Sequence, residues 1–249
     1  MHPAEPDRGA AAGPGAAPGS RDDAPGIATL ILPVGDDALL VDLGEPAGIR
    51  AARRAQALAA AIRSRRAAGD HALASCGDPI AAATSILVTF DPLAGDPDAL
   101  ARILADLVAA IPADPAPLPG AREHVFPVRY GGAGGPDLAP VAVEAGLTPD
   151  DVIALHGSVA YEVLFLGFAP GFSYLGEVPA QLAVPRLATP RVHVDAGSVA
   201  IAGVFTAVYP QASPGGWRLL GVTDVRLFDA TADEPALLRA GDRVRFRPR

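Results

Sequence analysis

Hydrophobic residues near the start of the chain fall in short runs and then change to a helical spacing. Apolar runs at 27–32 and 38–43 flank the turn Pro-Val-Gly-Asp-Asp, a pattern that predicts a hairpin. From 47 to 67 the apolar positions recur as on one face of an amphipathic helix. The arginines of this segment lie largely off that face, so they form either a solvated surface or a site for an acidic partner.

A further strand and helix are predicted before residue 112. Residues 85–90, Ser-Ile-Leu-Val-Thr-Phe, have the composition that is typical of a buried strand. Asp96 has the position of an N-cap and Pro97 that of a first helical residue, and Pro112 ends the helix. Two helices beside a small sheet predict an α+β layer over 27–119.

The second half of the chain consists of short strands separated by Gly and Pro turns. The prolines of 112–120 indicate a domain boundary, and short helices are expected at 137–145 and 149–156. We predict strands at 124–130, 162–166, 191–194, 198–202, 206–209, 217–221, 225–228 and 243–247. Many short strands of this kind indicate that 120–249 is an all-β barrel or sandwich.

The composition narrows the classes of function. The formal net charge is −8, and an acidic chain lacks the basic surface that nucleic acids require. All 20 basic residues are Arg, which excludes a P-loop lysine and a Schiff-base lysine. Cys76 is the only cysteine, so no internal disulfide forms, which fits a reducing compartment.

The chain shows no apolar run of membrane-spanning length and no signal-peptide core, so we expect a cytoplasmic protein without membrane contact. Residues 1–26 contain almost only Ala, Gly, Pro and charged residues, and we expect them to be a disordered tail.

Most familiar catalytic signatures are missing from the chain. His71, His124, His156 and His193 have no metal-ligand spacing, so we expect no metal site. The glycine-rich run 131–135 is either a cradle for an anion or a flexible turn.

A glycine- and aromatic-rich segment at 167–176 is the most distinctive candidate for a binding site. Glycine permits close approach of the backbone, proline restricts the path, and the aromatic rings offer rigid apolar surface. The segment is therefore either the wall of a pocket or a loop that seals the barrel. Its candidate binding residues are Gly167, Phe168, Pro170, Gly171, Phe172 and Tyr174.

Three charged or titratable residues are candidates for chemistry beside this segment. His156 is expected at a helix C-terminus, which favours the charged imidazolium; it acts as acid, base or anchor, or it caps the helix. Arg186 and Arg191 lie in proline-stiffened turns, where they bind an anionic group or pair with Glu177 or Asp195. Trp217, the only tryptophan, lines a pocket or the core.

Several motifs together resemble one protein family. They are F-L-G-F-A-P-G-F-S-Y-L-G from 165, P-R-L-A-T-P-R from 185, A-G-S-V-A-I-A-G from 196, V-Y-P from 208 and S-P-G-G-W-R-L-L-G from 213. The chain is similar over about 27–247 to the family of the 5-oxoprolinase B-type subunit (PxpB), also called the allophanate hydrolase subunit 1 or KipI-like family.

The resemblance implies an α+β N-terminal domain and a cyclophilin-like β-barrel. It also implies a C-type partner (allophanate hydrolase subunit 2) and a lactam-opening A-type partner, and the three together open 5-oxo-L-proline to glutamate with ATP and Mg²⁺. The ATP site is expected to be shared with the C-type partner. In the KipI branch the partner is instead a sensor histidine kinase, and a third hypothesis, prolyl isomerase activity, rests on the barrel fold alone.

On this resemblance, His156 and Arg191 are the candidate catalytic residues. The candidate substrate-binding set adds Ser198, Gly215, Gly216 and Trp217 to the residues of the 167–176 segment.

The chain departs from the family pattern at a few polar positions. Family members usually read A-G-G-Q-T-G-V-Y-P where this chain has Val204, Phe205 and Ala207, and G-R-T-P where it has Val222. Losing an amide and a guanidinium removes donors for a polar ligand, which predicts an altered substrate or a regulatory role.

Overall fold

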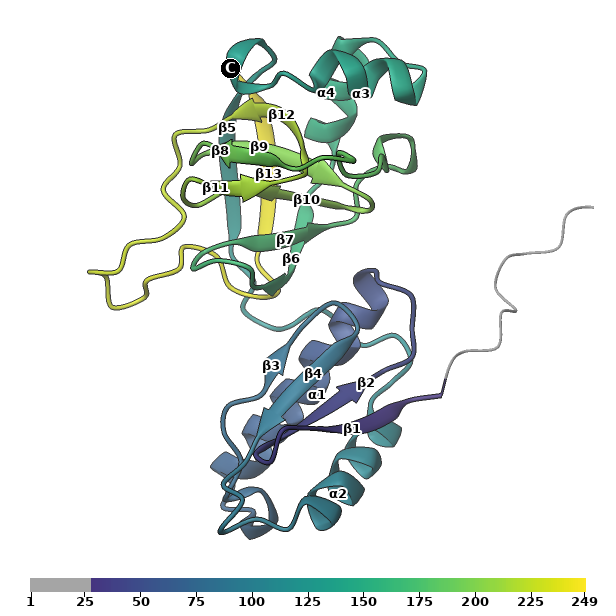
Figure 1. The fold of residues 1–249 in the computed structure, drawn as a ribbon, viewed down its shortest axis with the longest axis vertical. Coiled ribbons are helices and arrows are strands. Elements are labelled where there is room, and N and C mark those ends of the chain that lie inside the picture. Colours follow the sequence, from purple (N-terminus) through teal and green to yellow (C-terminus); the bar gives the residue numbers. More distant parts are fainter. Residues whose placement is uncertain (1–27) are drawn as a thin grey trace, which may run out of the picture.

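The computed structural model describes residues 28–249, and the predicted tail lies outside them. The first unit contains β1 (Leu30–Val34), β2 (Ala38–Asp42), α1 (Ile49–Ala67), a 3₁₀ turn (His71–Leu73), β3 (Ile80–Ala81), β4 (Ser85–Thr89) and α2 (Pro97–Ala110). The strands form an antiparallel sheet in the order β1-β2-β4-β3. Both helices lie on one face of this sheet, as Figure 1 shows, so the predicted α+β layer is confirmed.

Alternation along the strands explains why the helices cover only one face. Leu39 and Val41 of β2 and Ile86 and Val88 of β4 point toward the helices and are buried. The second helix begins where the sequence predicts, because the Asp96 carboxylate accepts hydrogen bonds from two backbone N–H groups of the first turn.

The second unit is a closed barrel with two helices packed against it. Its elements are β5 (Glu123–Tyr130), a 3₁₀ turn (Gly132–Gly134), α3 (Leu138–Ala145), α4 (Pro149–Ser158), β6 (Tyr161–Leu166), β7 (Ser173–Gly176), a 3₁₀ turn (Ala180–Leu182), β8 (Arg191–Val194), β9 (Ser198–Ala202), β10 (Phe205–Val208), β11 (Ser213–Gly215), β12 (Arg218–Val222) and β13 (Arg243–Pro248). The barrel order is β10-β7-β6-β13-β5-β12-β9, and β8 and β11 pair outside it. The expected barrel is therefore present.

The strand β9 is buried on both of its faces, which gives the barrel wall two distinct sides. Val199 and Ile201 of β9 belong to the barrel core, whereas Ala200 and Ala202 belong to a separate aromatic cluster outside the wall. The β8–β11 pair and Trp217 cover this outer side. Neighbouring residues of one strand therefore face different environments, and each candidate site residue on a barrel strand points either into the barrel core or toward the outer aromatic cluster.

The strand predictions differ from the structure at three places, one predicted strand that is absent and two strands that were missed. Residues 225–228 are not a strand but part of the long loop that extends from the barrel in Figure 1, apart from an isolated bridge between Phe228 and Ala236. Ser173–Gly176 and Ser213–Gly215 were not among the predicted strands, and they form β7 and β11. Both missed strands contain glycine, and β11 also contains proline; these residues are uncommon inside strands, so the sequence pattern did not indicate strands there.

The helix α1 joins the two units. Arg53 pairs with the buried Glu162 of β6 through an N–O distance of 2.7 Å, and the Gln56 side-chain amide donates to the Leu164 carbonyl. The backbone N–H of Ile49 donates to the Glu177 carboxylate at 2.8 Å. The side of α1 that carries Arg53 and Gln56 is thus an interface within the chain. The sequence pattern instead predicts that the arginines of this helix form a solvated surface or bind an acidic partner.

The other arginines of α1 are mostly occupied by partners in their own unit. Arg63 forms a two-pronged pair with Asp78, Arg65 pairs with Asp70, and Arg54 pairs with Glu45. An acidic external partner would therefore have to compete with these carboxylates for the guanidinium groups.

Helices long and apolar enough to cross a membrane are absent from residues 28–249.

Candidate functional site

A small pocket opens on the outer side of the barrel wall, where the glycine- and aromatic-rich segment meets strand β11. Its cavity volume is about 90 Å³. The lining residues are Phe168, Phe172, Tyr174, Arg186, Tyr209, Pro214, Gly215, Gly216 and Trp217. Three residues of the 167–176 segment thus line a recess, as the pocket-wall alternative expects.

Phe172 is the centre of the aromatic wall. Its ring packs edge-to-face against Tyr174, Tyr209 and Trp217, with centroid separations of 5.1, 5.4 and 5.6 Å. Such geometry is favourable for aromatic pairs, and the interlocked rings have few alternative rotamers. The pocket is therefore a preformed apolar recess.

Two backbone positions give the pocket its shape. A Cβ on Gly215 would overlap the Tyr209 hydroxyl, so only glycine lets the end of strand β11 lie against that ring. Phe168 adopts a positive φ of 77° and leaves its side chain 65% exposed. A bulky residue in the left-handed region carries strain of about 1–3 kcal/mol, a cost that occurs most often at binding sites.

Arg186 is the one cation among the residues that line this pocket. Its guanidinium lies 5.7 Å from the centre of the Trp217 ring, within range of a cation–π contact. Within residues 28–249 no carboxylate lies within salt-bridge distance of it. An aromatic recess with an available guanidinium at its edge suits a small ring that carries a carboxylate.

Arg191, the other candidate arginine, is occupied. It donates to Asp137 at 2.8 Å, and the second oxygen of that carboxylate accepts from the Leu219 backbone N–H at 2.7 Å. Neither of the expected partners is used: Glu177 bonds the Ile49 backbone and Asp195 pairs with His193. Arg191 also donates to the Trp217 carbonyl at 3.4 Å, so it braces β8 against α3 and the start of β12 and supports the pocket from behind without lining it.

His156 lies on the other side of the wall, inside the barrel. Its Nδ1 is 2.7 Å from the Tyr130 hydroxyl and its Nε2 is 2.9 Å from the Thr206 hydroxyl. Because the Thr206 hydroxyl donates to the Ala200 carbonyl, it accepts from Nε2–H, and Nδ1 accepts from Tyr130. Both ring nitrogens are therefore satisfied in the neutral tautomer.

The expected charged imidazolium is therefore wrong. His156 is fully buried, its ring stacks on Phe246, and burial lowers its pKa from 6.5 to about 3. The favourable field of a helix C-terminus is smaller than the cost of removing a cation from water. Burial likewise raises the pKa of Tyr130 above its usual value.

The remaining candidates lie around the pocket without lining it. Gly167 and Pro170 belong to the segment but not to its lining, and Ser198 is buried in β9. Gly171 has another role: its φ is +80°, and a Cβ would come within 2.8 Å of Phe228 in the long loop. Tyr209 and Pro214 were missed, although both lie within quoted motifs, V-Y-P and S-P-G-G-W.

The departures from the family pattern lie behind the pocket rather than in it. Phe205 faces the outer side of β10 and packs against Tyr174 and Phe165, with ring centroids 5.8 and 6.0 Å away. Ala207 is buried on the same side. Val204 lies in the turn before β10, and Val222 packs against Gly134 and Gly197.

The glycine run at 131–135 is a turn packed against β12, not an open cradle. The N–H of Gly131 donates to the Leu220 carbonyl, and a Cβ on Gly135 would overlap that carbonyl. These residues therefore do not fit a nucleotide phosphate. No group of three or more potential metal ligands occurs in the part of the chain that the structure describes.

Comparison with known proteins gives the chain clear relatives. The family model "Carboxyltransferase domain, subdomain C and D" matches residues 29–238. The 5-oxoprolinase B-type subunit of Escherichia coli O157:H7 is 59% identical over 130 residues, which are 52% of this chain and 60% of that protein. The Haemophilus influenzae protein of the same name is 38% identical over 216 residues, 87% of this chain and 96% of that protein.

A solved structure shares the fold. The Kluyveromyces lactis urea amidolyase superposes with a TM-score of 0.71 at 20% identity, over 89% of this chain and 15% of that one. The chain thus corresponds to a small part of this larger protein, and the likeness concerns the fold alone.

Proposed function

Since this chain belongs to the carboxyltransferase-domain family of subdomains C and D, together with the 5-oxoprolinase B-type subunits, we propose that it is one component of an ATP-dependent 5-oxoprolinase. The assembly would open the lactam of 5-oxo-L-proline to glutamate. The observation that supports this substrate best is the aromatic pocket with the Arg186 guanidinium at its edge, which has no carboxylate partner among the described residues.

The chemistry of the pocket fits the two ends of such a substrate. The exposed ring of Phe168, at the edge of the aromatic wall, would pack against the methylene side of the lactam ring, and Arg186 would hold the carboxylate by charge-assisted hydrogen bonds. Arg186 therefore takes the anchoring role for which Arg191 was a candidate. His156 has no access to this ligand, because the barrel wall lies between them.

The size of the pocket supports a shared site. The pocket is small, about 90 Å³, and open at the surface, so it would not enclose a ring with a carboxylate on all sides. Part of the substrate would therefore project from this chain and contact a second protein. We propose that this partner is the C-type component, the relative of allophanate hydrolase subunit 2, and that an A-type component completes the lactam-opening assembly.

ATP would be held by the partners. The described residues offer no phosphate-binding loop, and the glycine run packs on β12. What this chain would supply is recognition: Arg186 orients the carboxylate and the aromatic wall excludes water from the ring face.

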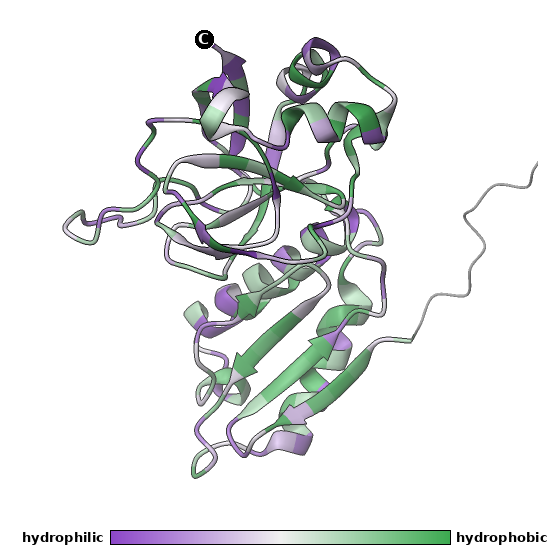
Figure 2. Ribbon diagram, turned by 45° about the horizontal axis from the view of Figure 1, so that its top comes forward, coloured by the Kyte–Doolittle hydropathy of each residue, from purple (hydrophilic) through white to green (hydrophobic). Residues whose placement is uncertain are grey.

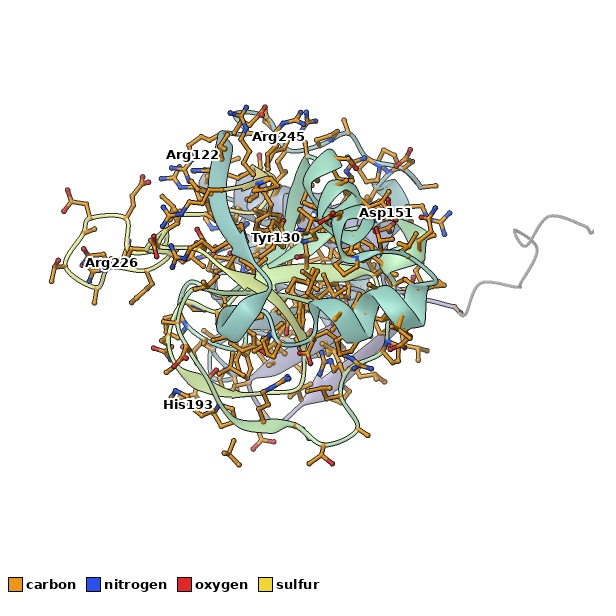
Figure 3. All side chains as sticks on the ribbon, turned by 90° about the horizontal axis from the view of Figure 1, so that it is seen from above. Arg122, Tyr130, Asp151, His193, Arg226 and Arg245 are labelled. Carbon is orange, nitrogen blue, oxygen red and sulfur yellow. The ribbon has the colours of Figure 1, made fainter. Side chains whose placement is uncertain are left out.

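The test is reconstitution of the chain with the C-type and A-type components of the same genome, followed by 5-oxoproline-dependent ATP consumption. Arg186→Gln should raise the KM for 5-oxoproline by about 10- to 150-fold, the loss of one charge-assisted hydrogen bond, with a smaller effect on kcat. Arg226→Gln is the matched control, since Arg226 lies on the protruding loop (Figure 3) and should leave KM unchanged. An assembly without 5-oxoproline-dependent ATP consumption would refute the substrate, and allophanate would then be assayed as the alternative amide.

A regulatory role similar to that of KipI is the second candidate. Phe205 occupies a position where the family pattern has a polar amide, and it makes the surroundings of Tyr174 more apolar. Such a pocket would bind a side chain of a partner instead of a polar metabolite. Slower autophosphorylation of a sensor histidine kinase from the same genome, without any substrate-dependent ATP consumption, would favour this role.

A further inference from the structure

The sheet of the first unit exposes a row of aliphatic side chains on the face opposite its helices. Strand register places Leu32, Leu40, Leu87 and Ile80 side by side across all four strands. Leu30 and Val34 flank this row on β1. We call these six residues the aliphatic sheet face.

The exposure of this face is high for a folded protein. Leu32 is 45% exposed and Ile80 58% exposed, whereas the apolar residues on the opposite face of the sheet are buried. In Figure 2 these strands are coloured as hydrophobic and lie in front of the helices. The barrel contacts α1, which is the other layer, so it does not cover the face. A contiguous apolar patch of a few hundred Å² is comparable to the largest patch on a typical monomer, and such patches are often functional.

Charge around the face indicates which occupant it fits. Every charged residue in 28–48 and 76–96, the segments that contain the four strands, is acidic. Asp36 and Asp37 form the β1–β2 turn, Asp42 ends β2 and Asp91 follows β4. We call these four residues the acidic rim. A second copy would bring two acidic rims together, so charge opposes a symmetric dimer and favours a partner with basic residues around an apolar centre.

Two further observations restrict the occupant. Residues 1–26 have no large aliphatic residue after Met1, so they cannot supply side chains that pack on the face. Pro33 lies in the edge strand β1 and removes a backbone donor there, which opposes the addition of a strand at that edge. The broad face, rather than the edge of the sheet, is therefore the docking element.

We propose that the aliphatic sheet face and its acidic rim dock a sister protein of the assembly, through an apolar patch ringed by arginine or lysine. The relatives are named as one component of 5-oxoprolinase, which implies partner proteins, and the inference rests on the assembly proposed above. Four strands at about 4.8 Å spacing give the face roughly 300 Å², against about 800 Å² per partner in a stable complex. The partner would therefore also contact another part of this chain.

The test measures binding of the full chain to the purified C-type component. The Leu32→Asp/Ile80→Asp double variant should raise the Kd by roughly 10- to 100-fold, because it removes apolar burial and places charge in the interface. Val143→Asp is the matched control, since Val143 is 82% exposed on α3 of the other unit, and it should bind normally. Asp36→Arg/Asp37→Arg should weaken binding and reduce its salt dependence without altering the sheet.

Each outcome separates this inference from the proposed function. Normal binding by both double variants, in an assembly that consumes ATP with 5-oxoproline, would overturn the docking surface and leave the function intact. Impaired binding in an assembly that ignores 5-oxoproline would support the surface and refute the substrate. A homodimer of this chain that Leu32→Asp/Ile80→Asp dissociates, with no binding of the C-type component, would also overturn the inference.

Discussion

Acidification should destabilise this protein through His156, and the size of the effect can be worked out. The ordinary pKa of 6.5 applies to the unfolded chain, and burial lowers the pKa in the native state to about 3. Between these values the unfolded state binds a proton that the native state does not. The contribution of the neutral His156 to the unfolding free energy is therefore fully present above about pH 6.5, and it declines as the pH falls toward about 3.

From about pH 7.5 to about pH 5 this single group should cost about 2 kcal/mol of unfolding free energy. The perturbation is His156→Gln, which keeps polar atoms toward Tyr130 and Thr206 but does not titrate. Urea denaturation at both pH values gives the loss for each protein. The wild type should lose about 2 kcal/mol more than the variant, while His193→Gln, at an exposed histidine, should behave as wild type.

An equal pH-dependent loss in His156→Gln and wild type would refute the reasoning. NMR of the imidazole gives an independent reading, because a neutral ring at about pH 5 is required even if the variant folds poorly. The same variant also tests the catalytic hypothesis: a structural His156 predicts an unchanged pH optimum for ATP consumption by the reconstituted assembly. A shifted optimum would instead return His156 to the reaction.

Three further predictions concern the pocket and the junction of the units. Gly215→Ala should abolish 5-oxoproline binding in calorimetry, because the added Cβ displaces the Tyr209 ring; unaltered affinity would contradict the pocket. Arg53→Ala should lower the unfolding free energy by about 2 kcal/mol in urea denaturation, because it leaves the buried Glu162 carboxylate without its partner. The loss is smaller than for a fully buried pair, since the Arg53 side chain is partly exposed. A double-mutant cycle with Glu162→Gln should recover most of that loss, and additivity would exclude the pair. Arg186→Gln should leave the urea midpoint within experimental error, and a large drop would make that arginine structural.

Local patterns predicted the elements because the forces behind them act over a few residues. The Asp96 cap, the helices and most barrel strands appear where spacing and turn residues placed them. Segments with glycine and proline inside a strand, such as Ser173–Gly176, were the exception, since pairing partners far along the chain determine them.

The family, and the α+β-then-barrel fold that it implies, followed from sequence motifs alone, because each motif is local and has its own physical cause. The residue pattern left open whether 167–176 walls a pocket or seals the barrel, and the tertiary structure answered this by placing Phe168, Phe172 and Tyr174 on a recess. Tertiary structure decided which charged residues are available. Arg186 and Arg191 lie in similar proline turns, yet among the described residues only Arg191 meets a carboxylate, from Asp137. His156 lies shortly before the 167–176 segment in the sequence, yet His156 and the pocket are on opposite sides of one strand layer. Pairing, burial and side-chain direction depend on contacts between distant segments, and a linear pattern does not contain them.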